Sequence, residues 1–169
     1  MTATIGQGTS RTDDGTQHLH FELHLPHPVE RVWFAVATAP GLRQWLAAAD
    51  VLVPRLGGAV TLRWLNQEGD AAVHAGRVTA WDLERIAEYT LDSLHGRMRF
   101  HLEPDGRDGT TLRFTNEFRG DDALRLDCLA GWHDHFEFLA EALGGHPKDW
   151  STWTPSRWQR FRDVYASRG

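Results

Sequence analysis

The sequence has little cysteine, no long apolar run and no excess of basic residues. Cys128 is the one cysteine, so no disulfide can form within the chain, which suits a reducing cytosol. No apolar run approaches the roughly 20 residues that a membrane-spanning helix needs. The formal net charge of −5 gives no support to a surface for nucleic acid or anionic lipid. We therefore expect a cytoplasmic protein with no nucleic-acid partner and no membrane partner.

Motifs that would announce a particular chemistry are also missing. The chain shows no nucleophile beside an activating base, no Gly-rich phosphate loop and no Cys/His spacing for zinc. We therefore expect no metal and no cofactor, and we name no catalytic residue. Residues 1–16 lack the basic start and apolar core of a signal peptide and are rich in Thr, Gly and Asp. This composition cannot bury much surface, so we expect a disordered lead-in.

Four histidines stand close together in the stretch "HLHFELHLPHP", residues 18–28. Residues 18–25 alternate between apolar and polar, which predicts a half-buried strand with His18, His20, Glu22 and His24 on one face. Neighbours on that face lie about 7 Å apart, too far for His18 and His24 to share one ion without a partner strand. The favoured interpretation is a solvated outer face, and a surface zinc site is the alternative.

In the rest of the chain the hydrophobic pattern changes from strand-like to helical near residue 121. Two short helices follow residue 28, and about six short segments of strand character then run to residue 118. Residues 121–143 have helical spacing, with an apolar stripe of Cys128, Trp132, Phe136, Leu139 and Leu143. A length of 169 residues fits one domain. We therefore predict an α+β fold in which a curved antiparallel sheet of about six to seven strands wraps around the long helix.

Four stretches, taken in order, resemble a known family. They are 27–46 ("HPVERVWFAVATAPGLRQWL"), 76–91 ("GRVTAWDLERIAEYTL"), 108–118 ("DGTTLRFTNEF") and 131–143 ("GWHDHFEFLAEAL"). Together they resemble the helix-grip fold of the START-like superfamily (SRPBCC), and within it the bacterial homologues of the heat-shock-protein-90 ATPase activator C-terminal domain. The resemblance covers residues 17–145, and residues 146–169 are an extension beyond the minimal family pattern.

A sheet bent around one helix leaves an internal space that is either filled by side chains or open to a ligand. By strand parity His74, Tyr89 and Asn116 point inward, where each must find a partner in the protein or in a bound molecule. The resemblance places Trp45 near the mouth of such a cavity. The candidate ligand-binding residues are Trp45, Trp64, His74, Tyr89, Phe100, Phe114, Asn116, Trp132, Phe136 and Leu139.

Three functions remain open for this fold. The first is binding of a small hydrophobic or amphipathic molecule between the sheet and the long helix. The second is a polyketide-type cyclase or aromatase that uses the same cavity, with acid–base groups drawn from the inward polar residues. The third is a co-chaperone-like or other protein-interaction module that uses the outer surface. Whether the chain is an enzyme is uncertain from sequence, and the absent motifs favour a binding protein.

The extension holds five aromatic residues, Trp150, Trp153, Trp158, Phe161 and Tyr165. Its five basic and two acidic residues give a net +3, which leaves −8 for the rest of the chain. We predict a helix over 155–165 that docks on the acidic domain of the same chain, with Phe138 as a candidate contact. A homodimer contact is the alternative. His133 and Glu137 are spaced as an i, i+4 pair, which we expect at the surface.

Overall fold

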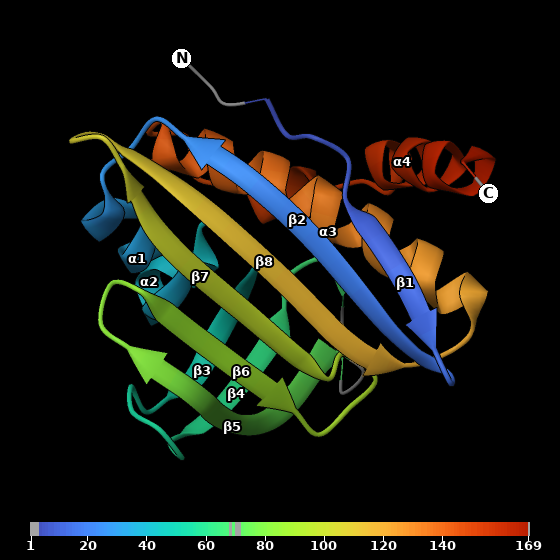
Figure 1. The fold of residues 1–169 in the computed structure, drawn as a ribbon, viewed down its shortest axis with the longest axis horizontal. Coiled ribbons are helices and arrows are strands. Elements are labelled where there is room, and N and C mark those ends of the chain that lie inside the picture. Colours follow the sequence, from blue (N-terminus) through green and yellow to red (C-terminus); the bar gives the residue numbers. More distant parts are fainter. Residues whose placement is uncertain (1–3, 68, 70–71, 169) are drawn as a thin grey trace.

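The computed structural model describes residues 4–67, 69 and 72–168. Figure 1 shows one large curved sheet with helices on one side of it. The strands are β1 (Thr9–Asp13), β2 (Thr16–Leu25), β3 (Ala47–Leu52), β4 (Ala59–Trp64), β5 (Val73–Asp82), β6 (Ile86–Leu91), β7 (Arg97–Asp105) and β8 (Gly109–Arg119). The helices are α1 (Val29–Ala37), α2 (Ala39–Arg43), α3 (Asp122–Leu143), the short 3-10 helix η2 (Trp150–Thr152) and α4 (Ser156–Ser167).

The sheet is antiparallel throughout, in the order β1-β2-β8-β7-β6-β5-β4-β3. The expected helix-grip architecture is confirmed, with eight strands rather than six to seven. The additional strand is β1, so the expectation that residues 1–16 are disordered is wrong for residues 9–13. Asp14 and Gly15 both have positive φ and form the turn that folds β1 back onto β2. The backbone pairing with β2 and the burial of Ile5 hold this segment in place. Its polar composition alone did not predict an ordered segment.

The long helix α3 lies across the concave face of the sheet, as predicted. The Asp121 side chain caps it by accepting a hydrogen bond from the Leu124 backbone N–H. Its stripe packs on aromatic residues of β8 and of the segment after α2: the Trp132 ring lies 4.3 Å from Phe114, and Phe136 stacks 5.8 Å from Trp45. The space between sheet and helix is therefore filled by aromatic side chains along most of its length.

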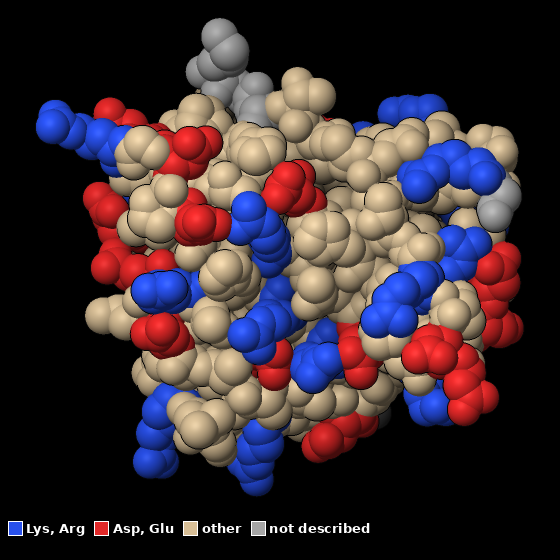
Figure 2. All heavy atoms as spheres, viewed as in Figure 1, with Lys and Arg blue, Asp and Glu red and all other residues tan. Residues whose placement is uncertain are grey.

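The histidine-rich strand β2 presents its polar face to the outside, as the favoured interpretation expected. His20 and His24 are exposed, and Glu22 pairs with Arg113 of β8 at 2.9 Å. On this face basic and acidic side chains are interspersed rather than gathered by sign (Figure 2). The described residues hold no group of three or more His, Cys, Asp or Glu side chains placed to bind a metal ion.

The extension docks on α3 of the same chain, which confirms that prediction. Figure 1 shows α4 lying beside α3 at the edge of the molecule. Arg157 lies 2.5 Å from the buried Asp134 carboxylate, and Arg162 lies 2.5 Å from Asp127. The basic extension therefore meets acidic groups of the domain. Phe138 receives it as expected, with Trp150 at 5.7 Å and the Lys148 ammonium over the ring at 4.7 Å.

The expectation of a surface His133–Glu137 pair is wrong. His133 is buried beneath α4, where Phe161 stacks on its ring at 4.0 Å and its Nδ1 lies 2.8 Å from the Tyr165 hydroxyl. Its Nε2 lies 3.8 Å from Glu137. Helical spacing placed His133 beside the core stripe correctly, but it could not reveal that a second helix covers that side.

Candidate functional site

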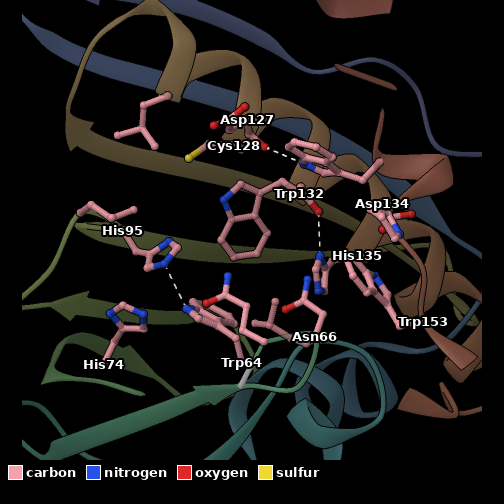
Figure 3. A pocket seen from close by; sticks show the side chains of 17 residues that line it. Trp64, Asn66, His74, His95, Asp127, Cys128, Trp132, Asp134, His135 and Trp153 are labelled. Atoms are coloured by element: carbon pink, nitrogen blue, oxygen red, sulfur yellow. Dashed lines mark hydrogen bonds between the residues drawn. The ribbon is translucent and has the colours of Figure 1, made fainter. Parts of the chain in front are cut away.

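A cavity of about 530 Å³ opens at one end of α3, between that helix, the β4–β5 side of the sheet and the extension. Figure 3 shows aromatic and imidazole rings around it from these three parts of the chain. The wall is mostly apolar, with a few polar groups, which is the usual composition of a small-molecule site. Its lining residues are Leu46, Trp64, Asn66, Gln67, His74, Leu94, His95, Leu124, Asp127, Cys128, Gly131, Trp132, Asp134, His135, Trp153, Pro155 and Trp158.

Three of the ten predicted ligand-binding residues line this cavity: Trp64, His74 and Trp132. They come from β4, β5 and α3, so strand parity and the helix stripe placed them correctly. The other seven do not line it. They pack in the closed part of the core, between the sheet and the two helices α1 and α3: Trp45, Tyr89, Phe100, Phe114, Asn116, Phe136 and Leu139.

The polar atoms of that closed core are bonded within the protein. Trp45 donates from its indole N–H to the Ala35 carbonyl at 2.8 Å, and Tyr89 donates its hydroxyl to the Val36 carbonyl at 2.7 Å. The roles assigned to Trp45 and Tyr89 at a ligand site are therefore wrong for this cavity. Burial raises the pKa of Tyr89 well above its usual value, so the phenol stays protonated and is a structural anchor for α1.

Asn116 also has a structural role, because each of its polar atoms is occupied. Its amide nitrogen donates to the carbonyls of His95 and Arg97 at 2.8 and 2.9 Å, and its carbonyl oxygen accepts from the Trp132 indole at 3.1 Å. Asparagine in a central strand is thus explained by a bond network that ties β8 to the β6–β7 turn and to α3. The prediction of an inward side chain is confirmed, and Asn116 does not line this cavity.

Several lining residues were not predicted, because they come from the extension or from a turn between strands. Trp153, Pro155 and Trp158 belong to the extension, and His95 lies in the turn between β6 and β7. The five aromatic residues of the extension indicated that they must be covered by something, but not that the extension forms a cavity wall. His135 lies on α3 one residue from the stripe, where the pattern gave no reason to single it out.

His74, at the start of β5, and His95, in the turn after β6, form one part of the cavity wall. The rings of His74 and His95 lie 4.7 Å apart, edge to face. His95 Nε2 accepts a hydrogen bond from the Trp64 indole at 3.0 Å, so the proton of the neutral ring sits on Nδ1. Burial first, and the neighbouring His74 second, lower the pKa of His95 to about 4. His95 is therefore a neutral ring at physiological pH.

On the opposite wall His135 is held by its own helix. Its Nδ1 lies 2.8 Å from the Gly131 carbonyl, and burial lowers its pKa, so this ring is also neutral. Three buried nitrogens have no hydrogen-bond partner among the described residues: His74 Nε2, His135 Nε2 and Trp153 Nε1. All three belong to residues that line the cavity. Each unpaired buried group costs about 1–3 kcal/mol.

The remaining reactive group in the wall is the Cys128 thiol, which is not an activated nucleophile. Burial and the adjacent Asp127 raise its pKa to about 12, so it stays protonated, and the thiolate is the reactive form. The carboxylates of Asp127 and Asp134 are each engaged by an arginine of the extension. Within the described lining, the groups left open to a ligand are thus neutral and suited to hydrogen bonding.

Comparison with known proteins assigns the chain to a family. Residues 26–144 match the family described as Activator of Hsp90 ATPase homolog 1-like protein. The chain belongs to this family. The match begins at Pro26 and ends one residue after α3. The Activator of Hsp90 ATPase homolog 1-like region therefore supplies the cavity walls formed by β4–β7 and by α3, and the extension supplies the third wall. No curated protein matches the chain.

Solved structures share the fold of this family member at low sequence identity. EF2215 from Enterococcus faecalis, described as a conserved protein of unknown function, is 15% identical with a TM-score of 0.72 over 95% of this chain and 91% of that one. CalU16 from Micromonospora echinospora is 17% identical with a TM-score of 0.71 over 99% and 98%. The protein encoded by gene BPP1335 from Bordetella parapertussis is 24% identical with a TM-score of 0.68 over 100% and 96%. At these identities the likeness shows the fold. No helix in the described part of the chain is long and apolar enough to cross a membrane.

Proposed function

We propose that this protein binds a small hydrophobic or amphipathic molecule in the cavity bounded by β4–β5, α3 and the extension. One observation carries the proposal: an open cavity of about 530 Å³ has a mostly apolar wall that includes the rings of Trp64, Trp132 and Trp153. A mostly apolar wall with a few neutral polar groups is suited to a guest with both apolar surface and polar groups.

An enzyme that uses the same cavity is the second candidate, favoured by the His74–His95 pair at its wall. A neutral histidine can accept a proton from a bound substrate, as a cyclase-like reaction would require. However, His95 Nε2 is already occupied by Trp64, and the Cys128 thiol is protonated. The described lining thus offers no activated nucleophile, which makes binding the better-supported function. The open cavity also supports these two candidates over a co-chaperone-like module that would act through its outer surface.

A cavity-filling variant tests the proposal. Gly131 lines the cavity, and a Cβ added there would meet only the Trp158 indole nitrogen, at 3.8 Å. Gly131→Leu therefore inserts its side chain into the cavity with little strain. Ala123→Leu adds a side chain of the same size to the exposed first turn of the same helix and is the matched control.

The experiment screens a library of lipids and neutral aromatic compounds for shifts in melting temperature. A compound at 100 times its Kd stabilises the folded protein by about 2.7 kcal/mol. We expect hits with the wild type and with Ala123→Leu, and loss of those shifts with Gly131→Leu. Hits that Gly131→Leu retains in full would contradict binding in this cavity.

A further inference from the structure

Two ion pairs join α4 to the face of α3 that lines the cavity. Asp127, Gly131 and Asp134 all line it, and their spacing of four and three residues puts them on one side of the helix. Arg162 pairs with Asp127, and Arg157 pairs with Asp134. The helix α4 therefore runs antiparallel to α3, and its two arginines hold it on either side of Gly131.

Between the two ion pairs the extension supplies part of the cavity wall. The Trp158 indole N–H donates to the Asp127 carbonyl at 3.1 Å. A Cβ added at Gly131 would lie 3.8 Å from the same indole nitrogen. Trp158 is thus placed directly against α3, and it lines the cavity together with Trp153 and Pro155 of the extension. The position of α4 on α3 therefore sets the position of this wall.

The apolar contacts of α4 are too few to fix that position alone. Of its 12 residues, all within the described part of the chain, Tyr165 is buried and the others are half-buried or exposed. A helix of this length is marginal by itself. Arg157 donates to the carboxylate of Asp134, which is 2% exposed, and to its backbone carbonyl at 3.2 Å. Removal of one partner from a buried ion pair is strongly destabilising, so these pairs make a large contribution to docking.

We propose, on the basis of the binding function proposed above, that Arg157 and Arg162 are positioning residues of the ligand site. Neither is among the described lining residues, but both hold against α3 the wall that carries Trp153 and Trp158. The affinity for a ligand then depends on the docking of the extension. Because coupling between two equilibria is reciprocal, a bound ligand also holds the extension in place.

Fluorescence titration of the full chain with N-phenyl-1-naphthylamine tests this role. This uncharged three-ring probe fluoresces in apolar surroundings. Arg162→Gln removes the charge that pairs with Asp127, and Arg162→Lys keeps it. Arg160→Gln removes one positive charge from an exposed position of the same helix and is the matched control. We expect Arg162→Gln to weaken binding of the probe about tenfold, Arg162→Lys to recover most of that loss, and Arg160→Gln to bind like the wild type.

Arg162 is the better of the two positions for this test. Its partner Asp127 has a side chain that is 45% exposed, so water can solvate the carboxylate when the arginine is removed. Arg157→Gln would leave the buried Asp134 carboxylate without its partner, and loss of fold could then imitate loss of binding. Circular dichroism of Arg162→Gln confirms that the variant is folded before it is titrated.

Hydrogen exchange of backbone amides, read by mass spectrometry, tests the reciprocal effect. Without the probe, Arg162→Gln should speed exchange in residues 156–167 and leave exchange in β7 and β8 unchanged, because only the docking of α4 is weakened. In the wild type the probe should slow exchange in residues 156–167. A role of Arg162 in stability alone would not make exchange in α4 depend on the probe.

The outcomes separate this inference from the function beneath it. If Arg162→Gln binds the probe as tightly as the wild type, or the bound probe leaves exchange in α4 unchanged, the positioning role is overturned while binding in the cavity stands. Equal weakening by Arg160→Gln would assign the effect to net charge and also overturns it. If Gly131→Leu binds the probe like the wild type, or if neither this probe nor any compound of the melting screen binds the wild type, the inference and the proposed function both fail.

Discussion

The Tyr165 hydroxyl joins three separate parts of the chain, and its removal should destabilise the protein measurably. The oxygen lies 2.8 Å from the Gly8 backbone nitrogen and 2.8 Å from His133 Nδ1. The Gly8 N–H donates to the oxygen, and the hydroxyl forms a hydrogen bond with the imidazole. Tyr165→Phe keeps the buried ring, which is 3% exposed, and deletes only this oxygen.

The expected cost follows from the two groups left behind. Each buried group that loses its partner costs about 1–3 kcal/mol, and the Gly8 segment lies near the chain end, where it can relax. We therefore expect a total loss of about 2 kcal/mol, or a melting temperature lower by about 4–8 °C for a chain of this size. Differential scanning calorimetry at pH 7.5 measures it directly.

Ser167→Ala is the matched control, because it deletes a hydroxyl from the same helix. That hydroxyl is exposed and bonds only to the Val164 carbonyl at 2.7 Å, so we expect a change within about 0.5 kcal/mol. A Tyr165→Phe protein that melts within one degree of the wild type, as the control should, would refute the bond network as a source of stability.

Three further predictions concern the whole fold. The pKa values of His133 and His95 are lowered to about 4 in the folded protein against about 6.5 in the unfolded chain, so the unfolded chain binds more protons between these values. The free energy of unfolding, measured by urea denaturation, should be constant above pH 6.5 and fall as the pH drops to 4, by up to about 2.7 kcal/mol per pH unit for the two groups together. A free energy of unfolding that does not change over this range would contradict this. Trp132→Ala should cost about 3–5 kcal/mol in chemical denaturation, and a loss below about 1 kcal/mol would count against its place in the core. Deletion of residues 146–169 should lower the melting temperature without changing the number of chains per particle, as measured by light scattering, and an oligomer that becomes a monomer would show that the extension serves assembly instead.

Much of the architecture could be predicted because it depends on periodicity. A two-residue period placed β2, with its histidines outside, and a helical stripe around Trp132 placed α3 on the sheet. Strand β1 was missed because Thr9–Asp13 is polar on both faces. It is held by backbone bonds to β2, and these leave no trace in hydrophobic patterning.

The site was predicted less completely, for a physical reason. Parity says that Trp45, Tyr89 and Asn116 point inward, but whether an inward group meets a cavity or another side chain depends on packing in three dimensions. The three are closed off by bonds to Ala35, Val36 and the β6–β7 turn. His135 and Trp153 became visible only when the extension was placed against α3.

The eight tryptophans provide the most direct test that the cavity binds a ligand. Each indole N–H gives one signal in a ¹⁵N correlation spectrum. The set that lines the cavity is Trp64, Trp132, Trp153 and Trp158, and the set outside it is Trp33, Trp45, Trp81 and Trp150. Titration with the compound that gives the largest melting-temperature shift in the screen should shift the indole signals of the first set and leave those of Trp33 and Trp81 in place. Shifts confined to the second set, or no shift in the first at saturation, would contradict binding in this cavity.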